Sequence, residues 1–124
     1  MRRVVQDVLQ ARPDAVLPMV APDGTASDAI RVMGEHDVDG VLVMEGGRLV
    51  GLVTERDHAR KVTLKGLSPY AVRIVDIMTR DVVTVAPSTT LDECRQLLAK
   101  NGFRHLPVVD GEQVVGLLSM PELW

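Results

Sequence analysis

The stretch from Gly51 to Asp57 contains the most chemically suggestive spacing in the chain. It reads Gly-Leu-Val-Thr-Glu-Arg-Asp, so an apolar run ends in the hydroxyl of Thr54 and, three residues later, the carboxylate of Asp57. Such a pair is typical of a capping box, in which two side chains satisfy backbone N–H groups at a helix start. The same two groups could instead hold a ligand, and the two roles are compatible. The spacing therefore predicts a strand that passes into a helix at Thr54.

The chain contains this arrangement twice. Residues 20–57 align with residues 85–122 without a gap, at an offset of 65 positions, and nine of the 38 pairs are identical. Upstream, residues 7–9 resemble residues 76–78 if four extra residues are allowed in the first copy around positions 12–17. An internal repeat of this kind indicates duplicated structural units. We divide the chain into a first motif over residues 1–66 and a second over residues 67–124.

Both copies predict the same order of elements. In the second copy a short β-branched strand over 82–85 precedes a helix that begins after Thr90 and ends near Asn101, where Gly102 suits a left-handed cap. Two further strands then flank a turn that contains Gly. The expected strands are 104–109 and 114–119 in the second copy, and 40–44 and 49–54 in the first. A closing helix over 55–64 follows in the first copy, and at most one turn in the second.

Composition narrows the functional classes. Hydrophobic residues make up 46% of the chain and aromatic residues only 2%, which predicts an aliphatic core in an α/β fold. The net charge of −3, without a basic stripe, argues against nucleic-acid binding. No apolar run approaches the roughly 20 residues of a membrane span, and the N-terminus lacks the pattern of a signal peptide. We therefore expect a cytoplasmic protein without a membrane segment.

Metal and nucleophile chemistry find little support in the sequence. The three histidines have no mutual spacing typical of a zinc site, and Cys94 is the single cysteine. Cys94 lies among apolar residues of a predicted helix, so a core role is favoured over that of a nucleophile. No Ser, His and Asp constellation is recognisable. We predict neither a metal site nor catalysis.

The duplicated β-α-β-β-α unit, with Gly-hydrophobic-x-Thr-x-x-Asp after its last strand, resembles the cystathionine-β-synthase (CBS) domain family. The resemblance covers about residues 5–124, and its most specific stretches are residues 51–57, 76–79 and 105–110. Two such motifs in tandem form a Bateman module. The resemblance implies an α/β (α+β) fold in which two pseudo-symmetric motifs pack through their sheets. It also implies that AMP, ADP, ATP or S-adenosylmethionine binds in clefts between the repeats and that occupancy is reported to a partner.

The first cleft that the resemblance implies is built on Thr54 and Asp57. The end of the strand–helix junction suits a phosphate, and the fixed carboxylate can accept both hydroxyls of a ribose. Arg56 could add charge beside a phosphate. By analogy with the family, this cleft is completed by Gly40, Val41, Leu42, Val82 and Val83. For Val41 and Val83 taken singly, a purely structural role in the core is the alternative.

The related second cleft would use Ser119 and Glu122, and here the sequence departs from the family pattern. Glu122 replaces the aspartate, and Pro121 removes a backbone donor. The further members implied by the resemblance are Arg104, His105 and Leu106 from the second copy, with Leu17 and Pro18 from the first. Arg104 and His105 could hold phosphates, or could simply be an exposed arginine and a half-buried histidine. We expect this second site to be weaker.

The sequence thus predicts a non-catalytic regulatory module that binds an adenosine-containing ligand and signals to an unidentified effector protein. By analogy with the family, we expect a homodimer. The alternative is a ligand-free dimerisation or interaction module, in which Thr54 and Asp57 only cap a helix. A small enzyme is a further alternative, which no spacing of acid, base or nucleophile supports.

Overall fold

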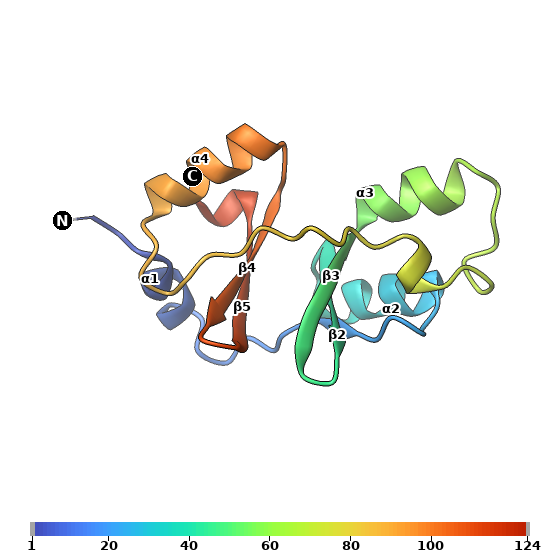
Figure 1. Cartoon of the computed structure of the whole chain (residues 1–124), viewed down its shortest axis with the longest axis horizontal. Coiled ribbons are helices and arrows are strands. Elements are labelled where there is room, and N and C mark those ends of the chain that lie inside the picture. The colour runs from blue at the N-terminus through green and yellow to red at the C-terminus, as the bar shows by residue number, and fades with distance from the viewer. Residues whose placement is uncertain (1, 124) are drawn as a thin grey trace. The chain divides into compact units, whose positions relative to one another are not determined.

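The computed structural model describes residues 2–123, which form two compact units (Figure 1). The central unit is continuous and runs from Pro18 to Val82. The split unit combines the residues up to Leu17 with those from Val83 onward. These compact units differ from the sequence motifs 1–66 and 67–124, because the first 17 residues join the second repeat and residues 67–82 stay with the first.

The central unit contains a three-stranded sheet of order β1-β2-β3. Strand β1 runs parallel to β2, and β2 pairs antiparallel with β3. In chain order its elements are β1 (Met19–Val20), α2 (Ala26–His36), β2 (Gly40–Glu45), β3 (Arg48–Thr54), α3 (Glu55–His58), the π-helical turn η1 (Ala59–Thr63) and the 3₁₀ turn η2 (Ile74–Asp76). The predicted hairpin is confirmed, as is the closing helix, which here consists of one α-helical turn and one π-helical turn.

The split unit repeats this plan with a smaller sheet, in which β4 and β5 are antiparallel. Its elements are α1 (Val5–Gln10), α4 (Leu91–Asn101), β4 (His105–Asp110), β5 (Gln113–Ser119) and the 3₁₀ turn η3 (Met120–Leu123). The helix from Leu91 to Asn101 is confirmed at both ends, with Thr90 as its N-cap and Gly102 in the left-handed region. A single closing turn, η3, is also as expected.

The predicted strand over 82–85 is wrong in extent, because only Val85 bridges β4. The reason lies in the partner strand. In the central unit, Leu42 N donates a hydrogen bond to Pro18 O. The position equivalent to Leu42 is Pro107, which has no N–H to donate, so the ladder cannot extend to residue 83.

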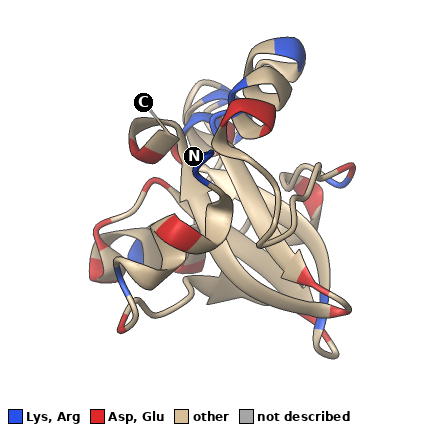
Figure 2. Ribbon diagram, turned by 90° about the vertical axis from the view of Figure 1, so that its left-hand side faces the viewer, with Lys and Arg blue, Asp and Glu red and all other residues tan. Residues whose placement is uncertain are grey.

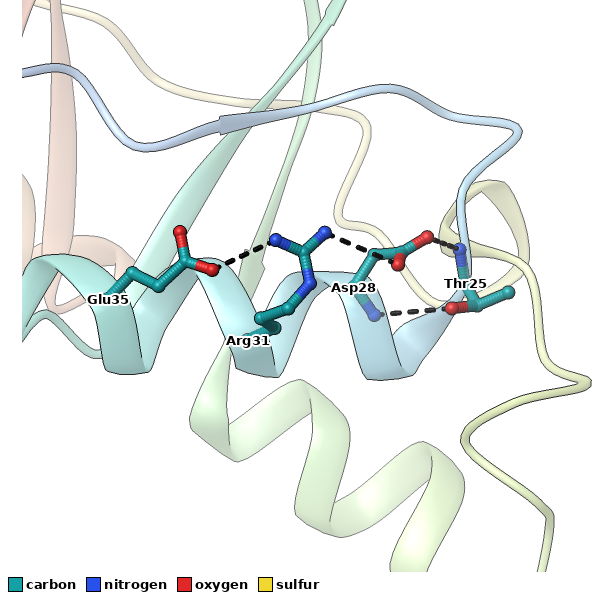
Figure 3. Close-up of polar contacts among 4 residues, drawn as sticks. All are labelled: Thr25, Asp28, Arg31 and Glu35. Carbon is teal, nitrogen blue, oxygen red and sulfur yellow. Dashed lines mark hydrogen bonds and ion pairs between the residues drawn. The ribbon is translucent and has the colours of Figure 1, made fainter.

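Helix α2 shows how local sequence fixes an element (Figure 3). Thr25 N donates to the Asp28 carboxylate over 2.9 Å, and Asp28 N donates to Thr25 Oγ1 over 3.2 Å, which completes a capping box. The backbone N–H of Thr25 is the main cause that lowers the pKa of the Asp28 carboxyl. One turn on, Arg31 forms ion pairs with Asp28 and Glu35. The repeated Thr-x-x-acid signal therefore marks a true helix start.

Each repeat begins with an entry segment, residues 2–17 in the first and 67–82 in the second. Each entry segment packs against the other repeat. In the split unit, Val5 N donates to Thr89 O and Leu91 N donates to Arg3 O. In the central unit the equivalent bonds join Ile74 N to Gly24 O and Ala26 N to Val72 O. Offsets of 69 for these entry segments and 65 for the rest agree with the four extra residues expected around 12–17. Each compact unit is thus completed by a segment from the other repeat.

Two glycines allow these entry segments to approach closely. A Cβ atom at Gly51 would lie 2.6 Å from the Met78 sulfur and 3.0 Å from the backbone O of Thr79. At the equivalent Gly116, a Cβ atom would lie 2.7 Å from Leu9 Cδ2. Both distances are too short for any larger residue without a shift, which explains why glycine occupies both copies.

Each unit has an aliphatic core of its own, as the composition predicts. Cys94 is fully buried in the core of the split unit, and burial raises the pKa of its thiol. In Figure 2 acidic and basic residues are interspersed on helices and hairpin turns, while the strands are largely uncharged. The helices and small sheets confirm a mixed α/β fold.

Candidate functional site

Thr54 and Asp57 meet at the end of β3, where the sequence places them. Asp57 Oδ2 accepts hydrogen bonds from Thr54 N at 3.0 Å and from Thr54 Oγ1 at 3.2 Å, while Asp57 N donates to Thr54 Oγ1 at 3.1 Å. The capping role is therefore present in full. It fixes the carboxylate, whose side chain is only 14% exposed, at a defined place above the strand.

The other oxygen of Asp57 contacts a residue that sequence reasoning missed. Lys61 Nζ lies 3.0 Å from Asp57 Oδ1 and donates a 2.8 Å hydrogen bond to the backbone O of Ile77. The i,i+4 spacing of Asp57 and Lys61 on a predicted helix was the available signal. The lysine balances the charge of the carboxylate and ties the closing helix to the segment after η2.

The remaining residues predicted for the first cleft take different places. Gly40 pairs with Thr54 across the hairpin, so it lies beside the junction. Val41 is fully buried in the core of the central unit, which supports its structural interpretation, and Leu42 is buried as well. Arg56 is exposed, and Val82 is half-buried. Val83 belongs to the split unit and packs against its core.

The second junction, at Ser119 and Glu122, repeats the two bonds that the carboxylate accepts at the first. Glu122 Oε1 accepts hydrogen bonds from Ser119 N at 3.0 Å and Ser119 Oγ at 3.1 Å. Arg12 Nη1 lies 3.2 Å from Glu122 Oε2, and Arg12 Nη2 donates to the backbone O of Leu117 at 2.9 Å. Arg12 was not predicted, since it lies at the start of the stretch 12–17 where the two copies differ by four residues. Its fork-shaped guanidinium suits two acceptors at once.

The other residues proposed for the second cleft differ in their surroundings. His105 pairs with Ser119 and is only 6% exposed, so it is more buried than expected. Leu106 lies in the core of the split unit, and Arg104 is exposed, with its backbone O accepting from Met120 N. Leu17 belongs to the split unit. Pro18 belongs to the central unit, where its O accepts from Leu42 N.

Between residues 2 and 123, no three side chains of the His, Cys, Asp and Glu types come together in a way that could hold a metal ion. Within the same residues, no helix has the length and apolarity that crossing a bilayer requires.

The chain contains a duplicated fold with a carboxylate at each of two strand–helix junctions. Comparison with known proteins identifies the family that has this fold. A family model described as CBS domain matches residues 5–57 and 74–123. The chain belongs to the CBS-domain family, and it carries two copies of the domain. The predicted resemblance is confirmed, as is its extent over nearly the whole chain.

Individual relatives support the assignment to the CBS-domain family. The CBS domain-containing protein CBSX3, mitochondrial, of Arabidopsis thaliana is 34% identical over 106 residues, which cover 82% of this chain and 52% of that protein. This chain thus spans about half the length of that relative. A solved structure of a protein with CBS domains from Burkholderia ambifaria MC40-6 has a TM-score of 0.92 and 41% identity, covering 97% of this chain and 90% of that one.

A more distant structure shares the fold alone. The CBS domain pair of protein MJ0100, solved in complex with 5′-methylthioadenosine and S-adenosyl-L-methionine, has a TM-score of 0.86 at 22% identity. It covers 99% of this chain and 94% of that one.

Proposed function

We propose that this protein is a non-catalytic regulatory module that binds an adenosine-containing ligand through the ribose at Asp57. One observation supports the proposal above all others: the Asp57 carboxylate is held at a strand–helix junction by Thr54 and yet keeps acceptor capacity. In the described part of the chain its contacts are Thr54 N, Thr54 Oγ1 and Lys61 Nζ, whereas a carboxylate offers about four acceptor positions.

The contacts of Asp57 support binding of the two hydroxyls of a ribose. Oδ1 has one contact, from Lys61, and so keeps one lone pair. Oδ2 has two, but the Thr54 hydroxyl can rotate its hydrogen away while it continues to accept from Asp57 N. Each oxygen then offers one position, and a vicinal diol supplies one donor to each. The exposed Arg56 next to Asp57 provides charge for a phosphate.

The family relationship supports the ligand class. The MJ0100 pair holds two adenosine-containing compounds in a fold shared with this chain. AMP, ADP, ATP and S-adenosylmethionine all present an adenine and a ribose diol, and they are the ligands we propose. Binding would alter the contacts of this chain with an effector protein, and we propose a homodimer as the working assembly.

A thermal-shift screen with AMP, ADP, ATP and S-adenosylmethionine tests the proposal, with inorganic phosphate and ribose-free adenine as controls. A ligand at 100 times its dissociation constant should stabilise the folded protein by about 2.7 kcal/mol. We expect a concentration-dependent rise in Tm with at least one of the four and no rise with the controls. A flat response to all four at millimolar concentration would contradict ligand binding.

The ligand-free interaction module is the second candidate. It is favoured by the complete capping box at Thr54, because the pair already has a structural role without any ligand. In this case the screen stays flat, while the chain still self-associates in analytical ultracentrifugation.

A further inference from the structure

Lys61 occupies a place that gives it influence over Asp57 beyond charge balance. Its ammonium group bridges Asp57 Oδ1 and the backbone O of Ile77, at 3.0 and 2.8 Å. It is carried by the π-helical turn Ala59–Thr63, in which Leu64 N bonds back to Ala59 O. Such π-turns inside helices occur frequently at functional sites. With a 39% exposed side chain, Lys61 is fixed at its tip and not by burial.

The two anchors of Lys61 determine which lone pairs of Asp57 remain available. The Ile77 carbonyl holds the ammonium to one side of the carboxylate, so one lone pair of Oδ1 is occupied from a fixed direction. Thr54 holds Oδ2 from the backbone side. With both oxygens held, the carboxylate cannot rotate freely, and its open acceptor positions keep the spacing that a vicinal diol requires.

We propose that Lys61 is a positioning residue that makes the site selective for ribonucleosides over 2′-deoxyribonucleosides. This inference rests on the proposed function, since it concerns the same carboxylate. When a ribose binds, its two hydroxyls donate one hydrogen bond to each oxygen of Asp57. A 2′-deoxyribose leaves one open acceptor position of this carboxylate, whose side chain is 14% exposed, without a donor, and an unmade hydrogen bond to a charged group carries a penalty. Without Lys61 only the Thr54 bonds to Oδ2 remain, so Oδ1 can pivot about Oδ2 and the carboxylate can meet a single hydroxyl equally well.

The competing physical expectation is that Lys61 blocks the site. In this case the ammonium must leave Asp57 before a hydroxyl can bind, and removing it would strengthen binding. The two expectations have opposite signs, so one substitution separates them.

The experiment compares adenosine with 2′-deoxyadenosine by titration calorimetry on wild-type protein, Lys61→Met and the control Arg60→Met, which alters the exposed neighbour of Lys61. We expect wild type and the control to prefer adenosine by roughly tenfold or more, the effect of one hydrogen bond to a charged group. In Lys61→Met, adenosine binding should weaken about tenfold and the preference should fall below about threefold. The corresponding 5′-monophosphates serve as the pair if the nucleosides bind too weakly to titrate.

A wild-type preference that persists in Lys61→Met, or tighter binding by that variant, overturns this inference and leaves the proposed function standing. Wild-type protein that binds neither compound nor any nucleotide overturns both. Thermal unfolding of each variant verifies the fold, and Lys61→Gln, which keeps a hydrogen-bond donor without the charge, is expected to lose the preference as well.

Discussion

The two strand-to-helix junctions use one hydrogen-bond scheme but take their cation from different parts of the chain. At each junction one carboxylate oxygen accepts both the N–H and the hydroxyl of the residue that ends the strand. The other oxygen of Asp57 contacts Lys61, which lies in the closing helix of the central unit. The other oxygen of Glu122 contacts Arg12, which follows helix α1 of the split unit. Both copies therefore have a cation beside the carboxylate, but the cation comes from a different element in each copy.

The difference extends to the backbone that each cation covers. In the central unit Thr79 N donates to Leu52 O, and Lys61 bonds to Ile77 O. At the equivalent of Leu52, Leu117 O accepts from the Arg12 guanidinium. One arginine thus takes the place of both a backbone donor and an ammonium group. Each cation contacts its carboxylate once and a backbone O once, but the planar fork of Arg12 holds its two contacts more rigidly than an ammonium group does. We therefore expect a structural role for Glu122 and the ligand at Asp57.

Removing each carboxylate in turn should give the largest difference between the two junctions. Asp57→Ala should weaken binding of the adenosine-containing ligand by about 100-fold, because both hydroxyls lose a charged acceptor. Glu122→Ala should change it by less than about threefold. Calorimetry on both variants measures the contrast, with circular dichroism to verify the fold. Equal losses would show that the junctions are functionally equivalent, and intact affinity in Asp57→Ala would refute the ribose assignment.

The glycines under the entry segments should also differ. Gly51→Ala is expected to cost about 1–3 kcal/mol of unfolding free energy, because its Cβ meets the backbone O of Thr79 as well as Met78. Gly116→Ala should cost less, about 1 kcal/mol or below, because its close neighbour is the end of the flexible Leu9 side chain. Urea unfolding of both variants tests the order. A larger loss at Gly116 would reverse our interpretation of the two contacts.

The two cations can be compared through stability as well. Arg12→Met should lower the unfolding free energy by about 1–2 kcal/mol, since Glu122 loses its partner and Leu117 O loses a donor. Lys61→Met should lower it by about 0.5 kcal/mol, as expected for a pair whose cation is partly exposed to water. Guanidinium unfolding of the two variants decides the order, and high salt should reduce the Lys61 effect more.

The smallest difference is expected between the N-caps of helices α2 and α4. Thr25→Ala and Thr90→Ala should each lower the unfolding free energy by about 1 kcal/mol, with the larger loss at Thr25, where the capping box is complete.

The hydrogen bond from Thr25 N lowers the pKa of Asp28 in the folded protein. The unfolded chain therefore takes up this proton at a higher pH. The stabilisation by Asp28 is present above its ordinary pKa of about 3.9 and is lost as pH falls further. Urea unfolding of wild type and Asp28→Asn should converge in acid, and a constant difference would contradict the assignment.

Much of the fold could be predicted because its signals are local. Thr25 and Thr90 mark helix starts, Gly102 marks a helix end, and the hairpins follow from pairs of apolar runs joined at turns that contain Gly46 and Gly111. The prediction of a strand over 82–85 was wrong because the length of this strand depends on a partner strand 22 or more residues away. In that partner, Pro107 has no N–H to donate. A single-sequence pattern records what a segment favours, and it does not record what its neighbour can supply.

The candidate site was predictable to a similar degree. Thr54 and Asp57 are only three positions apart and belong to the duplicated motif, so their pairing could be inferred. Arg12 could not, because it reaches Glu122 across 110 positions and lies at the start of the stretch where the two copies differ by four residues. Nor could the docking of each entry segment on the opposite repeat, which follows from packing against Gly51 and Gly116 and has no signature in spacing alone.

The docking of the first residues on the second repeat also orders events during synthesis. The central unit is a continuous stretch from Pro18 to Val82 and can fold as soon as it has left the ribosome. The split unit must wait, because Arg3 O bonds to Leu91 N and Arg12 contacts Glu122, close to the last described residue. Closing so large a loop is slow, since its entropy is lost before any contact forms. We expect the amides of α1 to acquire protection from hydrogen exchange only after those of β2 and β3.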